Sequence, residues 1–285
     1  MICFRLLDSD DPATPLAEAV ATLRRGEDAE SVYTVNPKSF RQVPNAPFAY
    51  WVSERIRGLF TALPPFESDG REVRVGLQTS DDFRFVRTAW ETPEVGTHQA
   101  WFPLTKGGKH SPFYVDVYLR VNWEKDGLEL DAFSGSVLRN TDYYFRPGLT
   151  WPARPHKRGA FSYIPSEVIF THTGPMAFTD TDNYLPTFCC LLNSTPYISL
   201  LHVLMPRGTS GHQSLKYEIG YVSSVPIPKT QESDDTSFAP LAKTAWSLKR
   251  HLDTTNSKSH TFYAPALTPG QCTAPRLAAK PGGTR

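Results

Sequence analysis

The stretch YYFRPGLTWPARPHKR, from Tyr143 to Arg158, combines features that few soluble folds need together. It begins with aromatic residues, prolines stiffen its backbone, and Trp151 at its centre has the size of a core residue. Its cations are Arg146, Arg154, Lys157 and Arg158, with His156 when protonated. A rigid, basic and aromatic loop suits a polyanion, because Arg and Lys neutralise phosphates and Arg can bind a guanine edge. The alternative is a proline-rich surface connection whose charges are simply hydrated, which is the commoner role of a charged run.

Local clustering of charge, and not the charge of the whole chain, is what an interaction with a polyanion would use. The 285 residues include 30 Lys plus Arg against 29 Asp plus Glu, for a formal net charge of +1. Between Arg139 and Arg158, however, five Lys or Arg face a single acid, Asp142. Binding through this cluster should weaken steeply with salt.

The apolar patterning predicts an α+β (mixed α/β) fold, in which helices and long proline-rich loops flank a twisted sheet. The length fits one large domain or two smaller ones, and 25 prolines with 12% aromatic residues argue against a helical bundle. Period-2 alternation and turn residues predict strands over 2–7, near 73–75 and 83–90, and over 113–121, 167–171 and 217–227.

Helical spacing of apolar residues predicts helices over 15–25, 48–63, 185–204 and 238–252. In the second of these, Arg55 and Arg57 are expected to point away from the apolar face. Pro196 predicts a kink or boundary of the third near Asn193 and Ser194. The apolar face of the last is expected to consist of Leu241, Ala245, Leu248 and Leu252.

Cysteine spacing and hydropathy indicate a reduced protein of the cytoplasm. The cysteines are Cys3, Cys189, Cys190 and Cys272, and no pair has the spacing of a zinc knuckle. The longest apolar run, around 188–205, is interrupted by polar residues, so we expect no membrane span. The first residues turn acidic at once, which differs from a signal peptide.

Motifs of known catalytic chemistry do not occur in the sequence. Gly107, Gly108 and Lys109 resemble the end of a phosphate-binding loop, but Pro103 occupies the place of its leading glycine and His110 follows the lysine. There is no GxGxxG, HExxH, GxSxG or Glu-x-Lys, and the eight histidines have no ligand spacing. Asp81 and Asp82 lie in a predicted turn, where capping is the default role. The residues alone therefore indicate neither an active site nor a metal site.

Several longer phrases nevertheless resemble a known family. They are GLQTSDDFRFVRTAWE from Gly76, WFPLTKGG from Trp101, LRNTDYYFRPGLTWPAR from Leu138, LLNST from Leu191, YEIGYVSSVPIP from Tyr217 and DTTNSKSHTFYAP from Asp253. In the same order, these resemble the carboxy-terminal half of large adenine-specific DNA methyltransferases. That family comprises the PglX-like proteins of BREX phage-defence systems and related single-chain (type IIG) restriction and methylation enzymes. The resemblance covers roughly residues 30 to 267, and so many phrases in one order are hard to obtain by chance.

In that family, a Rossmann-like catalytic domain precedes the matching region. Its glycine-rich loop binds S-adenosylmethionine, and its Asn-Pro-Pro-aromatic motif holds the flipped adenine. Neither motif is present here, since the early Asn36 and Pro37 continue with Lys38 and Ser39. The resemblance therefore implies a target-recognition portion, truncated or encoded as a split chain, with no cofactor and no methyl transfer of its own.

The implied organisation is an N-terminal helical connector (1–70), a target-recognition-like DNA-binding domain (71–230), a C-terminal helix and extension (231–267) and a disordered tail (268–285). Target-recognition domains read the major groove while Lys and Arg fix register on phosphates. The candidate contacts to double-stranded DNA are Lys106, Lys109, Arg139, Arg146, Arg154, Lys157 and Arg158.

Structural roles compete with each of these assignments. Arg139 or Arg146 could instead pair with Asp142 or Asp116, and Trp151, Tyr143 and Tyr144 are expected to be core or loop anchors and not stacking platforms. Two further hypotheses stay open for the chain as a whole. One is an interaction subunit or remnant that docks on a separate methyltransferase through the helices at 48–63 and 238–252, and the other is an enzyme with a divergent site.

Overall fold

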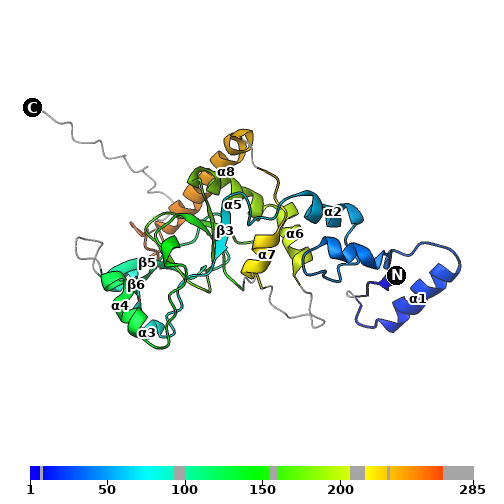
Figure 1. Ribbon diagram of the computed structural model, residues 1–285, viewed down its shortest axis with the longest axis horizontal. Helices are drawn as coiled ribbons and strands as arrows, with labels where there is room; N and C mark the ends of the chain where they lie inside the picture. The colour runs from blue at the N-terminus through cyan, green and yellow to red at the C-terminus, as the bar shows by residue number, and fades with distance from the viewer. Residues whose placement is uncertain (7–8, 93–99, 155–158, 206–215, 230–231, 266–285) are drawn as a thin grey trace, which may run out of the picture.

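The computed structural model describes residues 1–6, 9–92, 100–154, 159–205, 216–229 and 232–265. Helix α1 lies at one end of an elongated molecule, and strands β5 and β6 with helices α3 and α4 lie at the other (Figure 1). Between these ends lie β3 and helices α5, α6 and α7 (Figure 1). Helices and several small sheets make the fold mixed α+β, as the sequence predicts.

The N-terminal residues form a small unit of one two-stranded sheet and several helices. Strands β1 (Ile2–Phe4) and β2 (Val32–Thr34) pair antiparallel, with α1 (Ala13–Arg24) between them in the chain. A 3-10 helix, η1 (Pro37–Gln42), and α2 (Glu54–Ala62) follow. The helix predicted over 48–63 begins later than expected, because the Ser53 hydroxyl accepts a hydrogen bond from the Ile56 amide and caps it there.

Arg57 contradicts the sequence prediction for this helix. It was expected to point away from the apolar face, yet only 5% of its surface is exposed. Its guanidinium donates to the carbonyl oxygens of Val52 and Ala49, which belong to the non-helical turn before the helix. Buried carbonyl groups in such a turn need donors, and the arginine supplies them.

The central sheet has the order β3-β10-β7-β8, and all of its neighbours are antiparallel. Its strands are β3 (Arg71–Arg74), β7 (Gly148–Thr150), β8 (Ser162–Ile164) and β10 (Met176–Thr179). Strand β10 is buried on both faces: Ala177 belongs to the first hydrophobic core, whereas Met176 and Phe178 belong to the second. Since successive side chains point to opposite faces, this sheet separates the two cores.

The first core lies between the central sheet and a helical layer. The helices are α5 (Leu185–Asn193), α6 (Thr195–Leu204), α7 (Ile219–Ser224) and α8 (Glu232–Asp253), and the short η4 (Asp182–Tyr184) precedes α5. The boundary between α5 and α6 falls at Ser194, as predicted, and the two axes differ by 73°. Among the described residues, no single helix is long and apolar enough to cross a membrane, although this bent pair together passes that test.

The second core lies between the central sheet and a second sheet of order β4-β6-β5-β9. Its strands are β4 (Val86–Thr88), β5 (Trp101–Thr105), β6 (Leu119–Asn122) and β9 (Ile169–Phe170), and β5 and β9 run parallel. Around it lie α3 (Asp82–Phe85), α4 (Glu124–Ala132) and the 3-10 helices η2 (Ala89–Glu91) and η3 (Thr141–Tyr143). The stretch that begins at Tyr143 joins the two cores, because Tyr144 packs in the second and Trp151 in the first.

Several predicted elements differ in the structure. Of the strand predicted near 83–90, only β4 forms, because residues 82–85 are the helix α3 and 89–91 the 3-10 helix η2. Residues 113–118 precede a shorter β6 and are not a strand. Residues 219–224 are the helix α7, flanked by the extended residues Glu218 and Val225, and after it the Ile227 amide donates to the Pro64 carbonyl at 2.9 Å. In α8 the predicted apolar face is the exposed one: Leu241, Leu248 and Leu252 are 63%, 63% and 71% exposed.

Helix α8 packs instead through its small residues. Ala239 and Ala242 are buried, and α8 lies alongside α5. Alanines let two helix axes approach closely, whereas the leucine stripe lies on the other side of the helix. Apolar periodicity alone could not distinguish these two stripes.

Candidate nucleic-acid interface

Four segments that are distant in the sequence meet at one place; we call residues 76–82, 105–109, 150–154 and 171–175 the loop cluster. Gly107 has φ +79°, and a Cβ atom there would lie 2.6 Å from the Trp151 carbonyl oxygen. A Cβ atom on Gly174 would lie 2.0 Å from the Gly107 amide nitrogen. Three backbones therefore touch at positions that only glycine can occupy.

Backbone hydrogen bonds hold the cluster together. The Leu77 amide donates to the Phe170 carbonyl at 2.9 Å, and the His172 amide donates to the Leu77 carbonyl at 3.0 Å. The Ala153 amide donates to the Thr173 carbonyl at 3.1 Å. Each loop thus contacts another through its main chain. These contacts fix the positions of the Cα atoms from which the side chains of the cluster extend.

Asp82 is the acidic centre of the cluster. Its carboxylate forms an ion pair with the Lys106 ammonium and accepts a hydrogen bond from the Thr79 hydroxyl. Partial burial favours the neutral acid, but the hydrogen bonds from Lys106 and Thr79 outweigh it and hold the pKa of Asp82 below its ordinary value. Asp81 has a different role, because it caps α3 by accepting from the Arg84 amide at 3.0 Å. One of the two acids is therefore a cap, as the sequence suggested.

Two candidate cations of the cluster point to solvent. Lys109 and Arg154 are exposed, and neither forms an ion pair or side-chain hydrogen bond with the rest of the described chain. Because Gly107 lies against Trp151 and Pro152, the loops that carry Lys109 and Arg154 are in contact. The structure thus brings Lys106, Lys109 and Arg154 onto one surface region.

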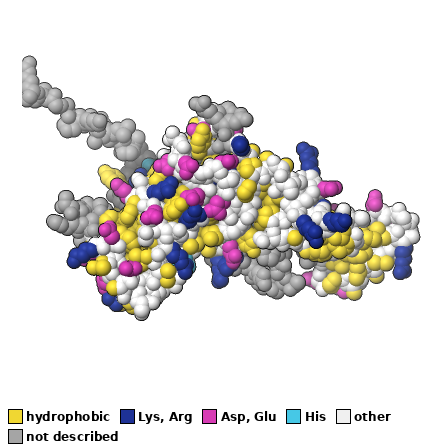
Figure 2. Space-filling view, viewed as in Figure 1, with side chains coloured by type: hydrophobic (Ala, Val, Ile, Leu, Met, Phe, Trp, Pro, Cys, Tyr) yellow, Lys and Arg dark blue, Asp and Glu magenta, His cyan; other side chains and the backbone are white. Residues whose placement is uncertain are grey.

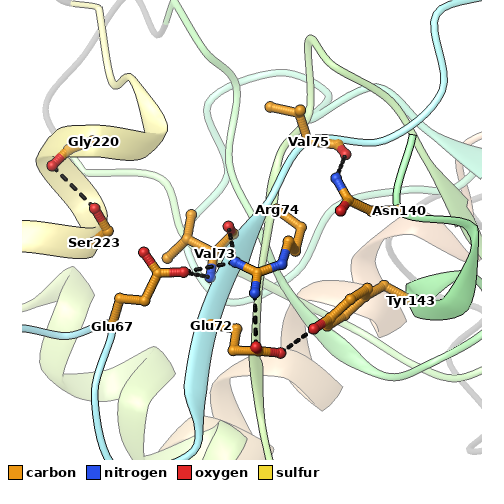
Figure 3. A network of polar contacts seen from close by, with 9 residues as sticks. All are labelled: Glu67, Glu72, Val73, Arg74, Val75, Asn140, Tyr143, Gly220 and Ser223. Atoms are coloured by element: carbon orange, nitrogen blue, oxygen red, sulfur yellow. Dashed lines mark hydrogen bonds and ion pairs between the residues drawn. The ribbon is translucent and has the colours of Figure 1, made fainter. Parts of the chain in front are cut away.

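Arg139 lies beside this region. Val137 and Gln78 exchange backbone hydrogen bonds of 2.9 and 3.0 Å, and the Asn140 side chain donates to the Val75 carbonyl at 2.8 Å (Figure 3). Arg139 lies in the sequence between Val137 and Asn140, so these two contacts place it next to residues 76–82 of the loop cluster. It is exposed, and among the described residues it has no acidic partner, so the expected alternative pairing with Asp142 does not occur.

Arg146 lies away from the loop cluster. Its guanidinium lies 5.1 Å from the centre of the Tyr143 ring and 5.5 Å from that of Phe178, and it donates to the Thr179 carbonyl at 3.5 Å. Thr179 is at the end of β10 opposite to the loop that contains Gly174. Asp116, the other alternative partner, binds His260 instead. Arg146 is thus occupied by aromatic rings and not by an acid.

Tyr143 belongs to the polar network shown in Figure 3. Arg74 forms ion pairs with Glu67 at 2.6 Å and Glu72 at 2.7 Å, and the Tyr143 hydroxyl donates to Glu72. Arg74 also lies 5.2 Å from the Tyr143 ring, so the ring has an arginine contact from each of Arg74 and Arg146. These contacts give Arg146 a structural role whether or not it binds DNA.

The aromatic residues of the central stretch are anchors, as predicted. Trp151 is 1% exposed and its indole nitrogen donates to the Tyr217 carbonyl at 2.9 Å. Tyr144 is 4% exposed, and burial raises the pKa of its hydroxyl far above the ordinary value. The remaining two candidates, Lys157 and Arg158, lie outside the described residues, as does the whole of the predicted tail (268–285).

The distribution of charge and of metal-ligating residues restricts the kind of site that this surface can form. On the face drawn in Figure 2, Lys and Arg side chains mingle with Asp and Glu side chains, in keeping with the net charge of +1. Within the described ranges, no group of His, Cys, Asp and Glu could hold a metal ion. Any polyanion site must therefore be local, and within the described residues the loop cluster has two exposed cations without an acidic partner, Lys109 and Arg154.

Sequence comparison identifies curated proteins that are similar to this chain. No protein-family model matches the chain. It is 24% identical over 243 residues to the adenine-specific methyltransferase PglX of Lacticaseibacillus casei (strain Zhang), an alignment that covers 79% of this chain and 20% of that protein. It is 26% identical over 218 residues to the adenine-specific methyltransferase BrxX of Escherichia coli O9:H4 (strain HS), covering 73% and 17%. The chain thus spans about a fifth of the length of these curated relatives.

Sequence analysis missed part of this site. It compared Gly107 and Gly108 with a phosphate-binding loop that they do not match, whereas Gly107 is packed against Trp151 and Gly174. It also gave Gly174 no role, although a glycine followed by Pro175 is a turn signal. The contact itself depends on strand order, which local patterns do not specify.

Proposed function

We propose that this chain is the DNA-binding specificity portion of an adenine-specific (N6) DNA methyltransferase system used in restriction or phage defence. Both curated relatives are named as adenine-specific methyltransferases, and the ordered phrases resemble the region that follows the catalytic domain of such enzymes. The partner is double-stranded DNA in the cytoplasm. Residues 71–230 carry the recognition surface.

The residues of the loop cluster have the chemistry that this function needs. Lys106, Lys109 and Arg154, with Arg139 beside them, supply positive charge to phosphates, and the arginines can also bind base edges in the major groove. Lys157 and Arg158 extend the same basic run in the sequence. The observation that carries the proposal is the meeting of Lys109 and Arg154 on touching loops, both exposed and both without an acidic partner among the described residues.

Duplex binding of the double variant Lys109→Ala/Arg154→Ala tests the proposal. We expect wild type to bind a mixed-sequence DNA duplex with an affinity that falls log-linearly with salt. The variant should bind about tenfold more weakly, and the magnitude of its salt slope should decrease by about 2. The control, Lys38→Ala/Arg55→Ala, removes one exposed lysine and one exposed arginine from the N-terminal residues and should bind as wild type does.

A second variant extends the test to the basic run. Arg154→Ala, Lys157→Ala and Arg158→Ala together should also lower affinity. Undiminished binding by both variants would reject the site, and absence of duplex binding by wild type would reject the function. Because the catalytic motifs are missing, titration with S-adenosylmethionine should release no binding heat; measurable heat would favour an enzyme with a divergent site.

The leucine stripe of α8 favours one alternative function, docking on a separate methyltransferase chain. Leu241, Leu248 and Leu252 are exposed at three points of one helix face. A catalytic chain of the kind that makes up the rest of the relatives would supply the apolar partner surface. Leu241→Gln/Leu248→Gln should leave the isolated chain as stable as wild type but abolish co-purification with such a chain. Duplex binding by a monomer unaided would count against docking as the main role.

A further inference from the structure

The outer face of the second sheet carries arginines and aromatic rings. Cross-strand register places Val86, Val121 and Phe102 in one row and Arg87, Arg120 and Pro103 in the next. The valine row belongs to the second core, where Val121 is fully buried. Because side chains alternate along a strand, the arginine row lies on the opposite, outer face.

Three aromatic side chains at this face are unusually exposed. Phe83 is 91% exposed, Trp90 59% and Tyr118 40%. The rings of Trp90 and Tyr118 are stacked, with centroids 6.5 Å apart and an angle of 13° between planes. A fold gains nothing from leaving such large apolar rings in water, so exposed rings together mark an interaction surface.

Arg87 lies against Phe83 and a further ring of the second sheet, that of Trp101. Its guanidinium lies 5.9 Å from the Phe83 ring centre and 5.6 Å from that of Trp101, and it donates to the carbonyl of Val86 at 2.8 Å. The nearby acid Glu91 is already engaged, because the Thr88 amide and hydroxyl donate to it at 2.8 and 2.6 Å. These hydrogen bonds lower the pKa of Glu91 and keep it ionised, so the face presents Arg87 and Arg120 beside one fixed carboxylate.

We propose that Phe83, Arg87, Trp90 and Tyr118, which we call the aromatic face, bind unpaired nucleotides of single-stranded DNA. Exposed aromatic rings stack on bases of any sequence, and arginine adds contacts to both phosphate and base. Four-stranded sheets that display aromatic rings are also the platforms of a common single-stranded RNA-binding module. The Trp90–Tyr118 pair and Phe83 provide two stacking positions, and Arg87 lies beside Phe83.

This activity goes beyond duplex recognition, because bases inside a duplex are already stacked and present no free ring surface. The two surfaces adjoin: Asp82, which binds Lys106 in the loop cluster, directly precedes Phe83. A strand separated from a duplex at the loop cluster would therefore meet the aromatic face within a short distance.

The test measures binding of fluorescein-labelled oligo(dT) to the full chain by anisotropy. Phe83→Ala/Trp90→Ala should weaken oligo(dT) binding at least about tenfold and leave duplex binding unchanged. The matched control is Phe48→Ala, since Phe48 is 57% exposed but lies outside the second sheet. It should bind oligo(dT) as wild type does. Circular dichroism confirms that each variant is folded, as expected for exposed positions.

The outcomes separate this proposal from duplex binding. Loss of oligo(dT) binding in the aromatic variant alone, with duplex binding still sensitive to Lys109→Ala/Arg154→Ala, supports both surfaces. Oligo(dT) binding that is absent in wild type or unaffected by Phe83→Ala/Trp90→Ala overturns the aromatic face and leaves the loop cluster standing. A tenfold preference for oligo(rU) overturns the assignment to DNA. If wild type does not bind oligo(dT) but the aromatic residues are required for a protein partner, the face is a protein interface and the proposal is wrong.

Discussion

Gly26 and Gly107 have the same φ of +79° but different surroundings, which makes them a matched pair. Nothing lies within 4 Å of a Cβ atom added to Gly26, whereas one added to Gly107 meets Trp151 and Pro152. Gly26→Ala should therefore lower the free energy of unfolding by about 1–2 kcal/mol, the cost of the left-handed backbone alone. Gly107→Ala should cost more, because the loops must also separate. Urea denaturation measures both.

The same pair tests whether the packing of the loop cluster matters for DNA. Gly107→Ala displaces the loop that carries Lys109 relative to the loop that carries Arg154, so its duplex affinity should fall while that of Gly26→Ala should not. Equal destabilisation by the two substitutions would show that the contact at Gly107 is absent in solution.

Because of Asp82, the free energy of unfolding should depend on pH. Folding lowers the pKa of this carboxyl below its ordinary 3.8, so its stabilisation is present above that value and is lost as the pH falls through the lower folded-state pKa. Asp82→Asn should therefore cost less than about 1 kcal/mol near neutral pH, as for other half-exposed pairs, and the cost should vanish in acid. Chemical denaturation from pH 7 to pH 2.5 follows this difference.

The Asp82→Asn substitution should also strengthen duplex binding, because Lys106 loses its neutralising partner. Asp142→Asn is the control, since it removes one exposed negative charge that is not bound to Lys106. If both variants gain affinity equally, the effect is a general one of net charge, and the ion pair does not mask Lys106.

At the residue scale, the sequence predicted the roles that depend on side-chain type. Trp151 and Tyr144 are buried anchors because large rings are stabilised by burial wherever the chain allows it. Arg57 was misjudged because an arginine can be buried when carbonyl groups accept its protons, and the turn that provides them is not visible in the pattern.

At the scale of elements, the helix pair α5 and α6 is where sequence and structure agree best, and Asn193 explains what happens at their junction. Its side-chain oxygen accepts from the Phe161 amide at 3.0 Å, and its side-chain nitrogen donates to the Phe161 carbonyl at 2.7 Å. The amide group thus binds the backbone next to β8 on both of its polar groups. This contact gives the LLNST phrase a structural role.

Asn193→Ala should lower the free energy of unfolding by about 2–3 kcal/mol, because the Phe161 amide loses its acceptor and the Phe161 and Cys189 carbonyls each lose one donor. Asn193→Asp keeps an acceptor for the Phe161 amide but places a carboxylate oxygen against the Phe161 and Cys189 carbonyls, so it should be no more stable than the alanine variant. Thermal unfolding compares them. An aspartate variant as stable as wild type would mean that the donor contacts contribute nothing.

The elements that were wrongly predicted share one cause. Alternation over 113–121 and 217–227 reflects residues that are buried singly by loops or by a short helix, and a period-2 pattern does not require a paired neighbour. In α8 both faces carry apolar residues, and tertiary packing selected the alanines. Local patterns therefore predicted the main helices, whereas tertiary partners decided which alternating segments became strands.

At the scale of the molecule, the sequence singled out the cations of the loop cluster but neither its glycine contacts nor its assembly. Lys106, Lys109 and Arg154 were chosen from charge and from resemblance to a family, whereas their proximity follows from β5 pairing with β9 and from Gly107 touching Trp151. Pairings between distant segments are set by the whole fold. Arg146, chosen on the same grounds, lies at the other end of β10.

The two hydrophobic cores should unfold together, because they share the central sheet. Leu149 lies in the first core and is fully buried, and Leu104 lies in the second and is 1% exposed. Leu149→Ala and Leu104→Ala should each cost about 2–5 kcal/mol and shift one transition in urea. Tryptophan fluorescence and far-ultraviolet circular dichroism should report the same midpoint for each variant. A biphasic curve in which Leu104→Ala moves one phase only would mean that the second sheet is an independent domain. The loop cluster would then lie at a domain boundary and could change shape when DNA binds.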